Sequence, residues 1–191
     1  MSSANKYLFQ AASEIQSFFT ENNWDFALIG GLAVIRWGQP RTTIDVDGTL
    51  LTMFVDEEKY IDAILARFSS RISNARDFAA NNRVLLLSAS NGFGIDISFG
   101  GLPFEQQMIE RSSLFAFEKD CVLRTCSAED LIVLKAFAAR DKDWADVDSI
   151  LQRQKGKLDI EYICENLQPL CELKNSPEIM TKIHQLMNRT K

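Results

Sequence analysis

The sequence lacks the features of a membrane-spanning or secreted protein. Its 191 residues contain no apolar run long enough to cross a bilayer. The first residues, MSSANKYLFQAASEIQ, have no basic stretch followed by an apolar core, so we expect no signal peptide. The four cysteines form no CxxC pair and have no histidine nearby, which argues against zinc and redox sites. We therefore expect a cytoplasmic protein with reduced thiols and no membrane partner.

Positive charge is also scarce. Twenty-one Lys and Arg residues stand against 26 Asp and Glu residues, a net charge of −5, whereas a protein that coats nucleic acid is normally basic. A local basic groove stays open, because the field depends on where the charges lie. The single histidine, His184, falls in a C-terminal helical pattern and is assigned no role.

The hydrophobic periodicity predicts both helices and strands. Helices are expected at residues 3–22, 32–37, 56–68, 103–111, 128–140, 159–173 and 176–188, and strands at 24–29, 42–53, 84–87, 93–99, 114–117 and 122–125. The stretch 69–80 is ambiguous, and Ser127 is expected to cap a helix. The fold class is therefore α+β, an α/β-type mixed sheet flanked by helices. We expect a core of residues 1–126 and a helical C-terminal part of residues 127–191.

The stretch Gly30–Leu51, GGLAVIRWGQPRTTIDVDGTLL, contains the first candidate site. Gly30 and Gly31 follow an apolar run, and glycine lets a ligand approach the main chain closely. Amides at the start of a helix can bind phosphate, although the glycines could also form only a tight turn. Arg41 and Thr43 lie where a cation and a hydroxyl could meet phosphates, but Arg41 is equally well explained as a surface charge.

Asp45 and Asp47 alternate along the strand that follows. Alternate side chains share a face, so both carboxylates point one way while Ile44 and Val46 point to the other side. Two such carboxylates repel each other unless a cation lies between them, and oxygen ligands suit Mg²⁺. An isolated Asp-x-Asp is usually a solvated strand end. Next to a phosphate-binding turn, however, the pair indicates phosphoryl or nucleotidyl chemistry.

Asp96 is a third candidate carboxylate. Ile95 and Ile97 flank it in a predicted strand, so alternation places it on the opposite face from both isoleucines. An aspartate in the middle of a strand is costly unless it is paired, hydrogen-bonded or bound to metal. Earlier in the chain, Arg71 belongs to a modest basic cluster that we assign no specific role.

These residues resemble the signature of the nucleotidyltransferase-fold superfamily: an apolar residue, two glycines, a spacer, then Asp-apolar-Asp-apolar. The matching residues are Ile29, Gly30, Gly31, Asp45, Val46 and Asp47. Gly48 departs from the pattern, which expects an apolar residue there. The resemblance implies a nucleotidyltransferase (polymerase-beta-like) fold with C-terminal helices. It also implies two Mg²⁺ ions held by Asp45, Asp47 and Asp96, with Asp96 as the base and the glycines at the phosphates.

A second resemblance is to bacterial AbiEii-like nucleotidyltransferases, many of them toxins or abortive-infection proteins. The chain matches their pattern at Lys135, Arg140, Lys142, Asp143 and Asp146. The resemblance implies that Lys135 contacts phosphate. It also implies that Arg140, Asp143 and Asp146 lie behind Lys135 and support it. Alternatively, Lys135 only pairs with Asp143 or Asp146, and the two aspartates only cap their helix or form salt bridges.

The function implied is transfer of a nucleoside monophosphate from a nucleoside triphosphate such as ATP to an acceptor hydroxyl. The AbiEii resemblance implies that the acceptor is the 3′ end of tRNA and that the enzyme is a toxin with a cognate antitoxin protein as partner. Two alternatives stay open. The acceptor could be an antibiotic or a protein, or the chain could be a weakly active nucleotide-binding or antitoxin-like module, as Gly48 would suggest.

Overall fold

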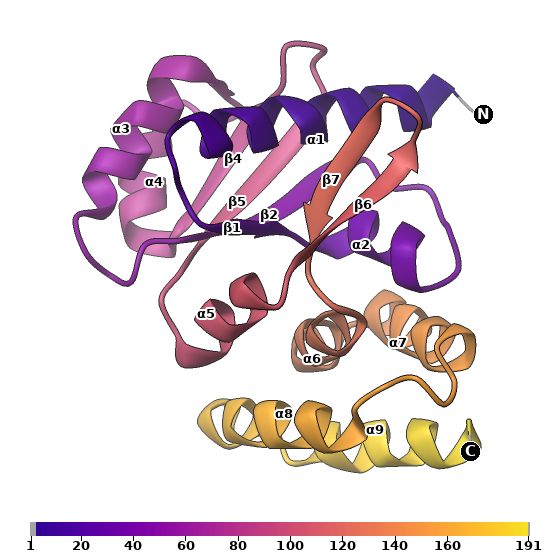
Figure 1. Ribbon diagram of the computed structural model, residues 1–191. Coiled ribbons are helices and arrows are strands. Elements are labelled where there is room, and N and C mark those ends of the chain that lie inside the picture. The colour runs from indigo at the N-terminus through magenta and orange to yellow at the C-terminus, as the bar shows by residue number, and fades with distance from the viewer. Residues whose placement is uncertain (1–2, 191) are drawn as a thin grey trace. The chain divides into compact units, whose positions relative to one another are not determined.

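A computed structural model describes residues 3–190 of the chain (Figure 1). The structure divides into two compact units. The first contains the residues up to Leu32 together with Thr42–Cys126, and the second contains Ala33–Arg41 and the chain from Ser127 onward. The second unit thus includes a short segment from early in the sequence as well as the C-terminal helices.

The first unit is built on a seven-stranded sheet. In order across the sheet, the strands are β3 (Ser69–Ser70), β4 (Val84–Ser88), β5 (Gly94–Gly100), β2 (Asp45–Leu51), β1 (Phe26–Leu28), β7 (Cys121–Thr125) and β6 (Ser113–Glu118). β2 is parallel to β5 and β1 is parallel to β7, and the other neighbours are antiparallel. The sheet is therefore mixed, as predicted.

Helices pack on this sheet at several places. They are α1 (Ser3–Glu21), α3 (Glu57–Arg67), α4 (Ala75–Asn82) and α5 (Pro103–Glu110). α1 runs along the sheet and contacts β2, β5 and β7, and α5 contacts β1 and β2 (Figure 1). The helical spacing of apolar residues in α1 explains its packing, because Ala11, Ile15 and Phe19 are fully buried. The stretch that was ambiguous in the sequence forms β3 and α4.

The second unit contains α6 (Ala128–Ala138), α7 (Asp141–Arg153), α8 (Ile160–Lys174) and α9 (Glu178–Arg189). Ser127 caps α6 as predicted, since its hydroxyl accepts a hydrogen bond from the amide of Asp130. Most residues of α6 are buried, because α7, α8 and α9 all contact it. Within residues 3–190, no helix has the length and apolar character that a membrane crossing needs.

Several predicted boundaries are corrected by the structure. Gly30 and Gly31 do not precede the short helix but begin it, as α2 (Gly30–Trp37). α6 ends two residues earlier than predicted, because Ala139 adopts a left-handed conformation with φ of 60°. Ile44 does not face the core, because β2 begins only at Asp45 and the Ile44 side chain is 79% exposed.

Gly48 lies in the middle of the sheet, opposite Leu28 on β1 and Ile97 on β5. A Cβ at this position would lie 3.0 Å from Cδ1 of Ile97 and 3.5 Å from Cδ2 of Leu28. Both neighbouring side chains are fully buried, so they occupy the space that an apolar residue would fill. The departure from the superfamily signature is therefore compensated by core packing.

We expect Gly48→Ala to destabilise the protein by about 1 kcal/mol, because the buried Ile97 methyl group must move. Ile97→Val removes that methyl group and should by itself cost about 1 kcal/mol. The double variant should be more stable than the sum of the two changes implies, with a coupling energy of roughly 1 kcal/mol. Urea unfolding of the four proteins measures this, and strictly additive effects would contradict the packing explanation.

Candidate active site

Three carboxylates converge on adjacent parallel strands. The register of β2 and β5 pairs Asp47 with Asp96 and Asp45 with Gly94. One carboxylate oxygen from each of Asp45, Asp47 and Asp96 lies within 4.8 Å of the others. Ligand oxygens on one Mg²⁺ ion lie roughly 3–4 Å apart, since each is about 2.1 Å from the metal. The donor set and its spacing therefore fit a divalent cation, after small movements of the side chains.

The two glycines at the start of α2 make close packing around this cluster possible. Gly30 has a φ of +59°, and a Cβ there would overlap the carboxylate of Asp47. A Cβ on Gly31 would overlap the side chain of Thr43. The predicted phosphate contact of both glycines stays a prediction, but their lack of side chains is required by the neighbouring residues.

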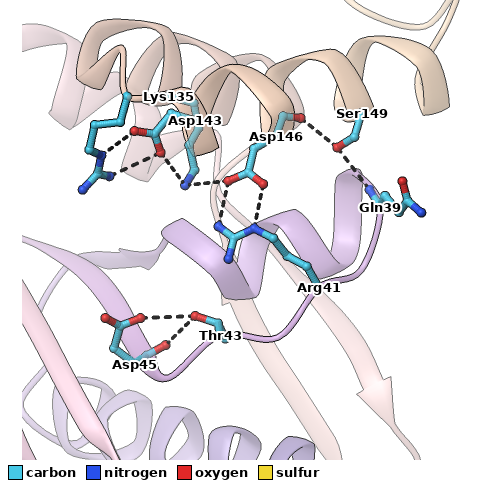
Figure 2. Close-up of polar contacts among 9 residues, drawn as sticks. Gln39, Arg41, Thr43, Asp45, Lys135, Asp143, Asp146 and Ser149 are labelled. Atoms are coloured by element: carbon cyan, nitrogen blue, oxygen red, sulfur yellow. Dashed lines mark hydrogen bonds and ion pairs between the residues drawn. The ribbon is translucent and has the colours of Figure 1, made fainter.

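Thr43 supports the first carboxylate directly. Its hydroxyl lies 3.2 Å from Oδ1 and 3.3 Å from the main-chain oxygen of Asp45 (Figure 2). Asp45 is the first residue of β2, where the sheet no longer restrains the preceding backbone. The Thr43 hydrogen bonds therefore restrict the Asp45 side chain at the open end of the strand.

Arg71 is a residue at this cluster that the sequence analysis did not identify. It follows β3 directly, and its guanidinium forms an ion pair with the carboxylate of Asp96. Gly94 leaves room for it, because a Cβ there would lie 3.3 Å from Nη1 of Arg71. No local sequence signal identifies this contact, which depends on the pairing of β3, β4 and β5.

The charges in the cluster act on Asp96 in opposite directions. Burial raises the pKa of Asp96, and the nearby charges of Asp47 and Asp45 also raise it, while the Arg71 charge acts to lower it. When all groups are ionised, three carboxylates and one guanidinium carry a net charge of −2. Negative charge therefore predominates among these groups, which supports the fit of divalent cations to them.

The second unit contains a separate cluster of alternating charges (Figure 2). Lys135 lies at its centre, with Nζ 3.1 Å from Asp143 and 3.0 Å from Asp146. Asp143 also pairs with Arg140 at 2.5 Å, and Asp146 accepts two hydrogen bonds from Arg41, at 2.7 and 2.8 Å. In these contacts three cations alternate with two carboxylates, and we call the five residues the ion-pair network.

Because the ion-pair network is largely buried, its charges interact strongly with one another. The side chains of Lys135, Asp143 and Asp146 are 8%, 0% and 4% exposed. Burial acts to raise the pKa of Asp143 and of Asp146, but hydrogen bonds outweigh it, from Arg140 and Lys135 in one case and from Arg41 and Lys135 in the other. Both pKa values therefore lie below the ordinary range, and both groups are charged at neutral pH.

The break between α6 and α7 brings Lys135 and Asp143 together. Eight residues apart, they would be separated by about 12 Å along one continuous helix. The left-handed Ala139 ends α6, and Asp143 lies in the first turn of α7. The chain therefore turns back, and the carboxylate reaches the lysine.

The ion-pair network shows which partners the charged residues of the AbiEii-like pattern have in the structure. The pairing of Lys135 with Asp143 and Asp146, one of the two alternatives from the sequence, is observed. Contacts of Lys135 and Arg41 with phosphate stay predictions, as does any direct role of Arg140. Lys142, the remaining residue of the pattern, is exposed.

Comparisons with known proteins identify the family and the fold. The family described as "Nucleotidyl transferase AbiEii toxin, Type IV TA system" matches residues 19–178. A crystal structure of an antigenic nucleotidyltransferase-like protein from Paracoccidioides brasiliensis superposes with a TM-score of 0.57 at 14% identity, over 95% of this chain and 94% of that one. This likeness confirms the predicted nucleotidyltransferase fold.

Other matches are weaker. The lincosamide antibiotic adenylyltransferase LnuA, bound to lincomycin, has a TM-score of 0.45 at 15% identity, over 72% of this chain and 92% of that one. The antibiotic-resistance factor ANT(2'')-Ia has a TM-score of 0.46 at 15% identity, over 95% and 89%. Among curated protein sequences, none matches the chain.

We expect Asp143→Asn to lower the free energy of unfolding by about 3 kcal/mol, because it leaves part of a buried positive charge without its partner. Asp141→Asn is the matched control, since Asp141 is an exposed carboxylate in the same helix and its replacement should change stability by less than about 0.5 kcal/mol. Urea unfolding at neutral pH measures both variants. Equal losses in the two would show that the ion-pair network is not coupled to stability.

The ion-pair network also predicts a pH dependence. Because the pKa values of Asp143 and Asp146 are lower in the folded chain, their stabilisation is complete above the ordinary value of 3.8 and is lost as the pH falls through the folded values. The stability difference between the wild type and Asp146→Asn should therefore be constant near neutral pH and shrink below about pH 4. Denaturant unfolding at a series of pH values measures this difference, and a difference that grew in acid would have the wrong sign.

Proposed function

We propose that this chain, which belongs to the AbiEii family of nucleotidyl transferase toxins, moves a nucleoside monophosphate from a nucleoside triphosphate to an acceptor hydroxyl at Asp45, Asp47 and Asp96. Pyrophosphate is the other product. The observation that carries the proposal is the convergence of the three carboxylates from paired parallel strands in a chain of this family. Carboxylates at this spacing have few structural uses, since they repel one another in the absence of a cation.

Asp45 and Asp47 would hold two Mg²⁺ ions, and Asp96 would hold one of them. Bound there, the ions would supply charge neutralisation at the attacking and leaving oxygens. The chain's own residues set the geometry. Thr43 restricts Asp45, and the absence of a side chain at Gly30 allows Asp47 its position.

Asp96 would also accept the proton of the attacking hydroxyl. It lies directly opposite Asp47 in the sheet, so a hydroxyl bound at the carboxylates would be within its reach. Asp96 is a half-buried carboxylate that remains partly open to solvent. A proton taken up there can therefore pass to water after the transfer.

The phosphates of the nucleotide need positive groups and amides. Gly30 and Gly31 would provide main-chain amides at the start of α2, and Thr43 a hydroxyl. Arg41 and Lys135 would bind phosphate oxygens, as the resemblance to AbiEii-like enzymes implies for Lys135. Asp143 and Asp146 would then act by holding the two cations in place, with Arg140 on the outer side of Asp143. Catalysis is thus positioning and charge neutralisation, as phosphoryl transfer requires.

The acceptor we propose is the 3′ end of tRNA, with a cognate antitoxin protein as the partner that restrains the toxin in the cytoplasm. Support for a toxin comes from the family, whose description places it in a type IV toxin–antitoxin system. The experiment supplies each labelled nucleoside triphosphate with total tRNA, with an aminoglycoside or with protein extract. Label on tRNA alone supports the proposal, and label on the aminoglycoside alone replaces it with drug modification.

Asp47→Asn should reduce nucleotide transfer at saturating Mg²⁺ by about a hundredfold to a thousandfold, because it removes a charged ligand at the reacting centre. Asp62→Asn is the matched control: Asp62 is an exposed carboxylate on α3 that pairs with Arg76, and its replacement should leave the rate unchanged. Transfer of label from the α-phosphate measures the rate. Full activity in Asp47→Asn would rule out the proposed site. Magnesium-dependent nucleotide binding without any turnover in the wild type would favour the weakly active binding module instead.

A further inference from the structure

Arg71 reaches the acidic cluster along a single row of residues across the sheet. The main-chain amide of Arg71 donates to the carbonyl of Leu86 at 2.9 Å, and the register places Leu86 opposite Asp96 and Asp96 opposite Asp47. Neighbours in such a row point to the same side of the sheet. The row therefore directs Arg71, Asp96 and Asp47 toward the same surface.

The backbone that carries Arg71 is held in place. The Ser70 hydroxyl accepts a hydrogen bond from the amide of Ile72 at 3.0 Å and donates to the main-chain oxygen of Ile72 at 2.9 Å, with the main-chain oxygen of Leu86 at 3.3 Å as a second acceptor within reach. The Arg71 side chain is by contrast 37% exposed, so it can move without disturbing the core. A fixed backbone with a partly exposed guanidinium would allow the cation to exchange between two partners.

Space around the guanidinium is provided by Gly94. This residue lies opposite Asp45, and a Cβ there would lie 3.6 Å from Cζ of Arg71 and 3.7 Å from Cβ of Asp45. Gly94 thus lies between the Arg71 guanidinium and the β-carbon of Asp45, and the ion pair of Arg71 is with Asp96. A carboxylate oxygen that is paired with arginine is less available to a metal ion. The guanidinium of Arg71 and a divalent cation would therefore compete for the carboxylate of Asp96.

We propose that Arg71 is the resident counter-ion of the acidic cluster and competes with the divalent cation for Asp96. Metal binding releases the guanidinium from Asp96, and the released guanidinium binds a phosphate oxygen of the nucleoside triphosphate. Arg71 thus couples metal binding to nucleotide binding. Without nucleotide, the metal binds weakly because it has to displace Arg71 from Asp96. With nucleotide, a phosphate oxygen replaces Asp96 as the partner of Arg71. This inference rests on the proposed metal site at Asp45, Asp47 and Asp96.

The test is calorimetric titration of Mn²⁺ into the full-length, nucleotide-free protein. Arg71→Gln should bind Mn²⁺ about tenfold more tightly than the wild type, because a positive charge next to the ion is removed. Its Mn²⁺-induced rise in melting temperature should be larger for the same reason. Arg71→Lys keeps the charge and should stay close to the wild type. Arg76→Gln is the control, since Arg76 pairs with Asp62 and Glu58 outside the acidic cluster.

The second half of the test is nucleotide binding at saturating Mn²⁺. Arg71→Gln should bind a non-hydrolysable ATP analogue about tenfold more weakly, while Arg76→Gln should not change. If the wild type binds Mn²⁺ and Arg71→Gln binds it equally or more weakly, the inference is overturned while the proposed function stands. If neither the wild type nor Arg71→Gln binds Mn²⁺, with or without the ATP analogue, the proposed metal site is overturned together with it. Unchanged nucleotide affinity in Arg71→Gln would overturn the release of the guanidinium to phosphate.

Discussion

Electrostatic repulsion among Asp45, Asp47 and Asp96 is the constraint on which the rest of the first unit depends. Three carboxylate oxygens within 4.8 Å of one another are unfavourable unless positive charge or hydrogen bonds offset them. The surrounding residues are arranged accordingly. Thr43 hydrogen-bonds Asp45, Arg71 pairs with Asp96, and Gly30 leaves Asp47 the space it needs. A protein without a use for this charge would gain stability by replacing any of the three.

The ion-pair network of the second unit solves the opposite problem. Lys135, Asp143 and Asp146 are almost completely buried, so each charge has to be paired within the protein. The alternating order of cations and carboxylates achieves this. In the acidic cluster the carboxylates are instead partly exposed, and three of them face one another.

The sequence alone predicted the local elements and the fold class well, because hydrophobic periodicity reports directly on which face of an element is buried. It also identified Asp45, Asp47 and Asp96, since aspartates that alternate with apolar residues in a strand are unusual. The errors were local. The second strand was predicted from residue 42, although β2 begins only at Asp45, and α6 was extended past the left-handed Ala139, which no glycine marks. Gly48 looked like a weakness because its compensation by Ile97 comes from another strand.

What the sequence determined by itself is the set of charged residues available for chemistry and the elements on which they lie, because alternation and helical spacing are properties of neighbouring residues. Only the tertiary structure decided which charges meet. Arg71 reaches Asp96 through the order of three strands, and Arg41 reaches Asp146 across more than half of the chain. Such pairs depend on strand order, register and chain reversal, which are set by the packing of the whole core and leave no periodic signal in the residues that form them.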